Sequence, residues 1–196
     1  MYGGKNGPCS VHTEVLLWDP RSGWQTLRSL KSDPMPRFGA TFVGLGNNHG
    51  ILFGGMRQDG IICQDFWRWR LIIREDRVAG ISFKPSTALD VSVGSYPFLG
   101  RFGASYSVIR NEVLIIGGIA RVGCIPKSYE ILSISGSFSA VGEYETEPEL
   151  KVACVEPVMP PDQPRPFLVG HTSIRTRKDQ TLIVGGGAVC VSTRIS

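Results

Sequence analysis

Hydrophobic and polar positions recur in three segments of this chain that begin alike and end alike. Residues 37–55 read RFGATFVGLGNNHGILFGG, residues 101–118 read RFGASYSVIRNEVLIIGG, and residues 170–186 read GHTSIRTRKDQTLIVGG. Each segment runs from an alternating stretch through a turn to a short apolar run. Alternation is typical of a half-buried strand, and a short apolar run between turn signals is typical of a strand buried on both faces. Each segment therefore predicts two adjacent strands.

The intervening sequence adds two more strands to each repeat. The predicted first strands cover residues 40–43 and 104–108, and the predicted second strands cover residues 51–53, 113–116 and 182–184. The predicted third strands cover residues 15–18, 66–71 and 129–132, and the predicted fourth strands cover residues 24–27, 80–83 and part of 151–155. Asn47, Asn48 and Asn111 supply turn residues that tolerate positive φ. The repeating unit is thus predicted to be a group of four strands.

A glycine doublet ends each second strand. The doublets are Gly3-Gly4, Gly54-Gly55, Gly117-Gly118 and Gly185-Gly186. The first spacing, from residue 3 to residue 54, is close to the roughly 50-residue period of kelch repeats. The longer spacings that follow predict insertions in loops. Four strands, a doublet after the second and an aromatic residue in the third resemble a kelch blade, and that resemblance implies a β-propeller.

The predicted fold is all-β: a kelch-type β-propeller fragment of about three four-stranded blades. Within the single segment 1–196, two blades are expected to be complete and two partial, in the parts 1–33, 34–96, 97–164 and 165–196. Because closed propellers typically have 4–8 blades, we expect an open arc cut from a larger propeller. Unpaired outer strands would make such an arc poorly soluble. The alternative is a small irregular β-domain that closes in another way.

Some stretches are more specific than the kelch pattern. GRFGASY followed by VLIIGGIARVGCIPKSYEILSI, and FLVGHTSI followed by TLIVGGGAVC, resemble the propeller region of the fungal tRNA wybutosine-synthesizing protein 4 family, also called leucine carboxyl methyltransferase 2. The residues that carry the resemblance are Arg101, Phe102, Gly103, Gly117, Gly118, Ala120, Arg121, Pro126, Ser128, Tyr129, Glu130, Gly170, His171 and residues 185–190.

The resemblance implies a place in tRNA modification. In that family an amino-terminal methyltransferase domain binds S-adenosylmethionine, a kelch propeller follows, and a cupin-like JmjC domain comes last in fungi. The enzyme methylates and methoxycarbonylates the wybutosine side chain of phenylalanine tRNA. By resemblance, this chain is the non-catalytic propeller, a scaffold or tRNA docking surface without a cofactor of its own. Its implied partners, reached through the full-length protein, are phenylalanine tRNA and proteins.

The methyltransferase and JmjC domains are expected to be absent from this chain, so we expect that it neither binds S-adenosylmethionine nor methylates tRNA. The final residues VSTRIS depart from the family pattern. Together with the abrupt start at MYGG, they predict a truncated or misspliced product.

Charge is compatible with an RNA partner but does not require one. The net charge is +4 over 196 residues, a mild excess compared with most nucleic-acid-binding modules. Arg175, Arg177 and Lys178 fall in a predicted hairpin turn, where solvation is favoured over RNA contact. Arg68 and Arg70 alternate with tryptophans along a strand, so the basic and aromatic pairs face opposite sides. Core aromatics with solvated arginines are favoured over base stacking.

Cysteine and histidine spacing favours neither disulfides nor metal. The chain has five cysteines and no CxxC pair, which argues against a disulfide framework or a zinc site and favours a reducing compartment. His12, His49 and His171 lie far apart without a metal-binding motif. No phosphate-binding loop, nucleophile motif or tuned carboxylate pair stands in a credible context. We therefore predict no catalytic, cofactor-binding or metal-binding residues.

Three residues are candidates for a binding face. Arg37 and Arg101 both precede Phe-Gly at the head of a first strand, where a guanidinium can hold a phosphate bidentately. The competing hypothesis, which we favour, is that each arginine ties neighbouring blades through backbone carbonyls. His171 matches the positions of Ala40 and Ala104, so packing is favoured over catalysis.

Targeting signals and membrane-spanning segments are not recognisable, so the predicted localisation is cytoplasmic. Residues 140–163 are acidic and then proline-rich, and we expect a long disordered connection between blades. Three functions compete: a propeller portion of the wybutosine enzyme, a kelch adaptor that binds proteins, and a copper-using kelch oxidase. Scattered histidines disfavour the oxidase, and the first hypothesis is preferred.

Overall fold

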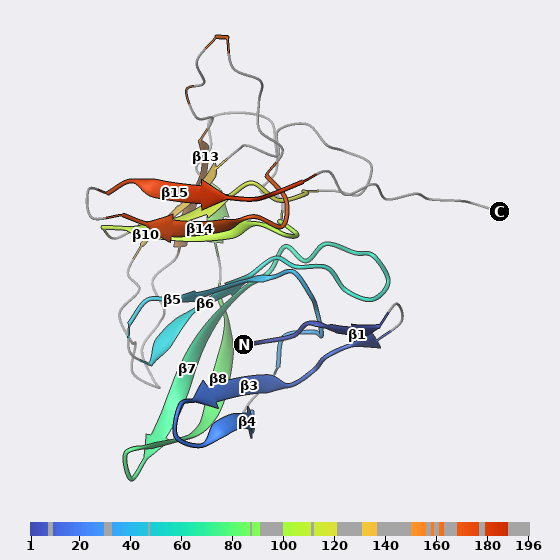
Figure 1. Cartoon of the computed structure of the whole chain (residues 1–196), viewed down its shortest axis with the longest axis vertical. Helices are drawn as coiled ribbons and strands as arrows, with labels where there is room; N and C mark the ends of the chain where they lie inside the picture. The colour runs from blue at the N-terminus through green and yellow to red at the C-terminus, as the bar shows by residue number, and fades with distance from the viewer. Residues whose placement is uncertain are drawn as a thin grey trace, which may run out of the picture.

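The computed structural model is built from short antiparallel sheets arranged in succession (Figure 1). It describes residues 1–7, 10–29, 33–46, 48–86, 88–90, 100–110, 112–120, 131–136, 150–155, 158, 161–162, 168–176 and 179–187. Within these ranges the regular elements are all strands. The all-β prediction is therefore confirmed.

Two sheets are complete blades. Blade 2 has the order β5 (Thr41–Gly44), β6 (His49–Phe53), β7 (Phe66–Arg74) and β8 (Arg77–Ser86), all antiparallel. Blade 3 repeats that order with β10 (Ser105–Ile109), β11 (Glu112–Ile116), β12 (Ile131–Ser135) and β13 (Leu150–Val155). The four-strand unit predicted from the repeats is thus present twice.

Two half-blades flank the complete ones. Blade 1 is the pair β3 (Val15–Asp19) and β4 (Gly23–Leu27), the third and fourth strands of a unit. Its second strand is represented by Tyr2, which bridges Val15. Blade 4 is the pair β14 (Thr172–Arg175) and β15 (Thr181–Val184), the first and second strands of a unit. Figure 1 shows these half-blades toward opposite ends of the described part of the chain.

Two features were not predicted from the sequence. A small hairpin of β1 (Lys5–Gly7) and β2 (Ser10–Val11) follows the first glycine doublet. The short strand β9 (Ala88–Asp90) lies in the part predicted to belong to blade 2, yet it pairs in parallel with β13 on the outer edge of blade 3.

The predicted disordered connection over residues 140–163 is wrong for its central stretch. Residues 150–155 form β13, as the strand prediction within 151–155 had it. The physical reason is the alternation of Leu150 and Val152, which are 0% and 1% exposed in the core. Residues 140–149, 156–157, 159–160 and 163 lie outside the described residues.

The hydrophobic core lies between the blades. One cluster joins blades 2 and 3 and includes Ile51, Phe53 and Val113, all at most 1% exposed. A second joins blade 2 to blade 1 through Trp69 and Val15. The contact between blades 3 and 4 has only a small apolar cluster that includes Leu168. Each inner strand of blade 2 therefore has one face on each neighbour, as predicted for strands buried on both sides.

The glycine doublet is the joint between successive blades. The amide of Gly55 donates to the carbonyl of Arg101 at 2.7 Å. Gly54 has a φ of 65°, and a Cβ at that position would lie 2.2 Å from the same carbonyl oxygen. A residue with a side chain would be strained in this conformation and would also collide with the next blade. The doublet recurs because the backbones must approach this closely.

The joint repeats along the arc. Gly4 donates to the Arg37 carbonyl at 3.3 Å and Gly118 donates to the Leu168 carbonyl at 2.7 Å. A parallel series links the first strands, because Gly103 donates to Gly39 at 2.9 Å and Gly170 donates to Gly103 at 2.8 Å. These bonds hold β5, β10 and β14 side by side and so position the surface described next.

Candidate functional site

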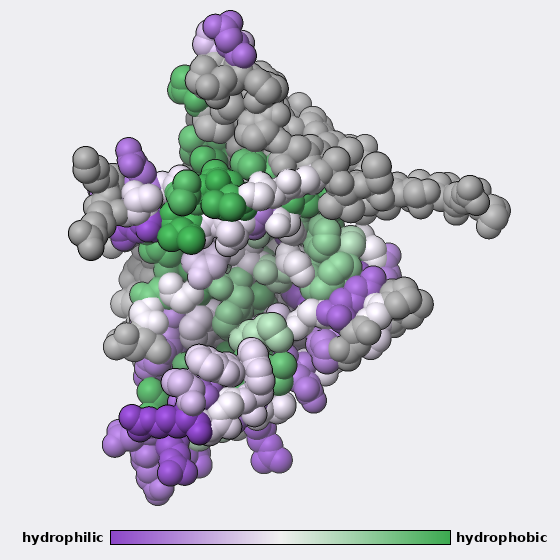
Figure 2. All heavy atoms as spheres, viewed as in Figure 1, coloured by the Kyte–Doolittle hydropathy of each residue, from purple (hydrophilic) through white to green (hydrophobic). Residues whose placement is uncertain are grey.

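The first strands form the wall of a concavity. Residues of β5, β10 and β14, with Met1 and Tyr2, line a hollow of about 850 Å³. Figure 2 shows it between the blade 4 and blade 1 ends of this face. Since the first strand is the innermost strand of a propeller blade, this wall is the part that would face a central channel. Of the three predicted binding-face residues, His171 lines this hollow, whereas Arg37 and Arg101 are not among its lining residues.

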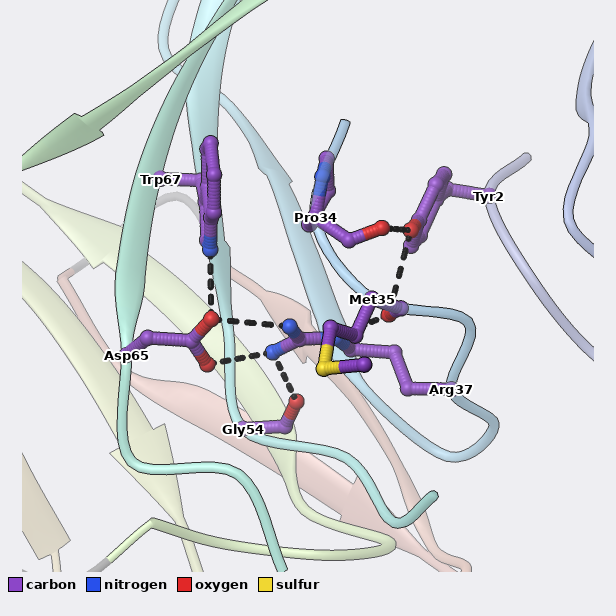
Figure 3. A network of polar contacts seen from close by, with 7 residues as sticks. All are labelled: Tyr2, Pro34, Met35, Arg37, Gly54, Asp65 and Trp67. Carbon is purple, nitrogen blue, oxygen red and sulfur yellow. Dashed lines mark hydrogen bonds and ion pairs between the residues drawn. The ribbon is translucent and has the colours of Figure 1, made fainter. Parts of the chain in front are cut away.

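Arg37 is held within blade 2 by a network that its sequence context did not reveal (Figure 3). Its Nη1 and Nη2 donate to the two carboxylate oxygens of Asp65 at 2.5 and 2.8 Å. Nη1 also donates to the Gly54 carbonyl at 3.2 Å, and Nε donates to the Met35 carbonyl at 2.9 Å. Arg37 is only 1% exposed. Planar bidentate pairing of this kind fixes the guanidinium in one orientation.

The carboxylate of Asp65 is the counter-charge that makes this burial possible. Desolvation pushes the Asp65 pKa upward, but hydrogen bonds from Arg37 and from the Trp67 indole, at 2.5 Å for the latter, outweigh it and the pKa is lowered. Desolvation likewise opposes the charge of Arg37, and Asp65 reverses the effect so that the Arg37 pKa is raised. Both groups are therefore charged at neutral pH.

Tyr2 joins the edge of this network. Burial raises the pKa of Tyr2 to about 12, so the phenol stays protonated and donates to the Pro34 carbonyl at 2.7 Å. The ring packs 5.4 Å from the ring of Phe83. Tyr2 therefore fastens the amino-terminal residues to blade 2.

The arginines were expected to tie neighbouring blades through backbone carbonyls, and the side-chain bonds of Arg37 differ from that expectation. The guanidinium of Arg37 bonds to groups of its own blade, whereas its backbone carbonyl accepts the bond from the preceding blade. Arg101 is 4% exposed and its carbonyl plays the same part for Gly55. In the third repeat Leu168 takes this position. The prediction that Arg37 and Arg101 contribute to a binding face stays a prediction.

Sequence reasoning missed Asp65, although a signal was present. An acidic residue directly precedes the third strand in each unit: Glu14, Asp65 and Glu130. A repeated acidic position beside a repeated arginine position predicts a pair. Glu130, the residue that would pair with Arg101 by this rule, lies outside the described residues.

His171 lies at the contact between blades 3 and 4, which we call the seam. It packs against neighbouring residues there, as expected of a structural rather than a catalytic residue. It is 7% exposed, and its Nε2 lies 2.7 Å from the hydroxyl of Ser105. Two further polar contacts continue the seam: Ser173 donates to the Tyr106 carbonyl, and Thr181 donates to the Ser107 hydroxyl at 2.8 Å. This blade contact is thus polar where the others are apolar.

The contact between blades 3 and 4 is expected to contribute less to the stability of the fold at acidic pH. Desolvation lowers the pKa of His171 from the ordinary value of 6.5, and the backbone of Ile116 opposes this more weakly. The folded state therefore favours the neutral imidazole. The stability that neutral His171 contributes to the folded state is fully present above pH 6.5 and is lost as the pH falls below that value. We expect His171→Ala to reduce the free energy of unfolding more at pH 8 than at pH 5, as measured by urea unfolding at both values. An equal reduction at both would contradict a neutral buried imidazole.

The described residues show no built site for a metal or a nucleotide cofactor. Among them, no three His, Cys, Asp or Glu side chains gather closely enough to hold a metal ion. Their regular elements are strands, and a glycine-rich strand-to-helix turn of the kind that binds nucleotides is not formed by them. Within the same ranges, no helical segment has the length and hydrophobicity needed to traverse a lipid bilayer. The catalytic and cofactor predictions gain no candidate residue from this geometry.

Successive antiparallel four-stranded blades, joined by glycine doublets with their first strands side by side, define a β-propeller arc. Residues 1–193 match the model of the β-propeller of tRNA wybutosine-synthesizing protein 4. The chain belongs to that family. Both the fold and the family resemblance inferred from the repeats are thereby confirmed.

Curated relatives carry the same description. The chain is 34% identical to tRNA wybutosine-synthesizing protein 4 of Emericella nidulans and 32% identical to that of Aspergillus fumigatus, in each case over 98% of this chain and 19% of the relative. It is 29% identical to the protein of that name from Neurospora crassa, over 98% of this chain and 17% of the relative. The chain thus spans about a fifth of the length of the curated relatives it matches.

Proposed function

We propose that this chain is a non-catalytic propeller that docks tRNA for catalytic parts lying elsewhere in a longer wybutosine-synthesizing protein. Family membership supports the tRNA substrate, because the relatives are named for tRNA wybutosine synthesis. Binding of S-adenosylmethionine and transfer of its methyl group are assigned to those other parts. The use of Arg37 in an internal ion pair supports a structural role for that arginine rather than a catalytic one.

The observation that carries the docking proposal is the basic ribbon, which we define as residues 66–86 of β7 and β8. It contains four arginines and one lysine against one glutamate and one aspartate, a net charge of +3 within a chain of net charge +4. The cationic residues are Arg68, Arg70, Arg74, Arg77 and Lys84. The ribbon thus places a net positive charge on two neighbouring outer strands.

The register places like charges opposite one another. Arg68 pairs with Lys84, and Arg74 pairs with Arg77. Positive charge clustered on neighbouring strands attracts a polyanion. Figure 2 shows the hydrophilic surface gathered at the end of the molecule where the β7–β8 hairpin projects. The phosphate backbone of tRNA has the charge density to occupy it.

The test is tRNA binding as a function of salt. We expect the 196-residue chain to bind unmodified phenylalanine tRNA with a steep salt dependence. The triple variant Arg70→Gln, Arg74→Gln, Arg77→Gln should flatten the slope of log K against log[salt] by about 2–3, because each lost phosphate contact removes somewhat less than one unit.

The matched control replaces three exposed cationic residues outside the ribbon. Arg21→Gln, Arg28→Gln, Lys151→Gln removes the same net charge and should leave most of the affinity in place. If both triple variants lose affinity equally, binding is diffuse and the docking proposal fails. If neither binds less tightly than the unaltered chain, the ribbon is not the contact.

A further inference from the structure

The five cationic side chains of the basic ribbon lie on one face of it. Side chains alternate along a strand, so Arg68, Arg70 and Arg74 share one side of β7. On β8, Lys84 is paired with Arg68 and Arg77 is paired with Arg74. Directly paired residues of an antiparallel pair point to the same side, so all five form one surface, which we call the cationic face. Four of the five side chains are exposed, and Arg68 is half-buried.

The aromatic rings of the ribbon are not available on this face. Trp67, Trp69 and Phe83 alternate with the cationic residues and therefore point to the opposite side. Trp69 and Phe83 are 8% and 1% exposed, and the Trp67 indole donates a hydrogen bond within blade 2. Phe66 shares the cationic side, but it is 3% exposed and stacks on another buried ring of its blade. The cationic face therefore offers charge without a stacking platform.

The outer half of the ribbon projects beyond the rest of its sheet. β6 pairs with β7 as far as Arg70, which lies opposite His49. From there the β7–β8 pairing continues to Arg74 and Arg77 next to the turn, and Figure 1 shows this hairpin extending away from the sheet. Within the described residues, Arg70, Arg74 and Arg77 have no carboxylate partner. Their charges are therefore available to a ligand.

The local structure of the hairpin makes it twist. Glu75 and Asp76 form the turn with φ of 49° and 59°. Two left-handed residues are typical of a type I′ turn, which matches the right-handed twist of the flanking strands. The register shifts between Ile72 and Ile73, and such an irregularity increases the local twist. Because two-stranded ribbons also twist more than larger sheets, the cationic face winds in a right-handed sense instead of lying flat.

We propose that the cationic face holds the phosphate backbones of a double-stranded RNA stem and recognises its shape, not its base sequence. This inference rests on the tRNA-docking function proposed above and names the part of the RNA that is bound. The two rows of cations lie about 5 Å apart and extend over about 20 Å, the length of six strand residues. Long side chains reaching outward from each row can contact phosphates on both sides of a groove, and the right-handed twist follows a right-handed duplex.

A-form RNA suits a surface of this kind. Its major groove is too deep and narrow for side chains to read, so proteins recognise the duplex through phosphates, 2′-hydroxyls and shape. An extended single strand suits it less well. It presents one row of phosphates to two rows of cations, and proteins that bind single strands add aromatic side chains on which the bases stack. The cationic face lacks such rings, so it should discriminate in favour of the duplex.

Competition against labelled, unmodified phenylalanine tRNA tests this discrimination in the 196-residue chain. The competitors are an RNA duplex of roughly 20 base pairs, longer than the about 16 that double-stranded RNA-binding domains span, and a non-pairing RNA strand with the same number of phosphates. We expect the duplex and a duplex of scrambled sequence to compete equally, each within about threefold of tRNA. The single strand should compete about 10-fold less well, because stacking is missing.

Two substitutions in the turn separate shape from charge. Asp76→Pro and Asp76→Asn each remove one negative charge, but proline cannot adopt a positive φ, whereas asparagine tolerates it. Asp76→Asn should therefore keep the preference for the duplex, and Asp76→Pro should reduce it to about twofold or less. Because the turn lies beyond the residues that pair with β6, both variants should keep the cooperative unfolding of the unaltered chain.

The outcomes separate this inference from the docking function on which it rests. A single strand that competes as well as the duplex, or an Asp76→Pro variant that keeps the full preference, would overturn recognition of duplex shape and leave tRNA docking in place. Unequal competition by the two duplex sequences would mean that bases are read, and would overturn it as well. A chain that fails to bind tRNA at all would instead refute the docking function.

Discussion

Replacing Gly54 by alanine is expected to lower the free energy of unfolding by about 4 kcal/mol. A left-handed backbone at a residue with a side chain costs about 1–2 kcal/mol, and forcing an extra methyl into a packed contact adds about 1–3 kcal/mol. At Gly54 both apply, because φ is 65° and the new Cβ would lie 2.2 Å from the Arg101 carbonyl oxygen. Relief requires blades 2 and 3 to separate, which breaks the 2.7 Å bond from Gly55. Urea unfolding followed by tryptophan fluorescence measures the loss.

Gly23→Ala is the matched control for this variant. Gly23 has a φ of 75°, but a Cβ there would meet no atom within 4 Å. It therefore reports the cost of the backbone conformation alone, about 1–2 kcal/mol. Equal losses at the two positions would mean that the close approach of the blades contributes nothing.

Asp65→Ala is expected to cost about 3 kcal/mol, the range seen when a buried charge loses its partner. The variant leaves the guanidinium of Arg37, 1% exposed, without its carboxylate and removes the acceptor of the Trp67 indole. Asp65 itself is 43% exposed, so water can enter beside Arg37 and keeps the loss from being larger. The midpoint of urea unfolding gives the value, provided that the slope with denaturant is unchanged.

Asp59→Ala supplies the comparison for Asp65. Asp59 pairs with Arg57 at 2.6 Å, but both side chains are at least 34% exposed, so the loss should be within about 0.5 kcal/mol.

The pH dependence of unfolding gives a second measurement of the Asp65 contribution. Because the Asp65 pKa is lowered from its ordinary value of 3.8, its contribution is present above that pH and is lost as the pH falls through the lower folded-state pKa. Asp65→Ala should remove that part of the acid sensitivity, whereas Asp59→Ala should keep it.

The sequence was sufficient for the strands that build the two complete blades. Residues 113–116 were predicted as a strand, and β11 covers Glu112–Ile116. This worked because period-two alternation and turn glycines are local signals, and because repetition let each unit confirm the others. A doublet was predicted to end each second strand, and Gly54 directly follows the last residue of β6.

Long-range pairings were harder to predict. No local sequence signal predicts that Ala88–Asp90 joins the outer edge of the following blade, because a three-residue strand is too short to show a hydrophobic pattern. The partner of Arg37 lies 28 positions away at Asp65, so spacing alone does not indicate it. The basic ribbon also escaped notice, because the like-charged pairs appear only when the register of β7 against β8 is known.

The glycine joint has a consequence for how such chains change in length. At each joint the following blade supplies a carbonyl and the preceding blade supplies an amide, and the pair has the same polarity from Gly4 to Gly118. If a unit were duplicated or deleted, the amide donor at each remaining joint would therefore still face a carbonyl acceptor. Unequal recombination can vary the number of units in a gene of this kind while each surviving junction remains chemically complete.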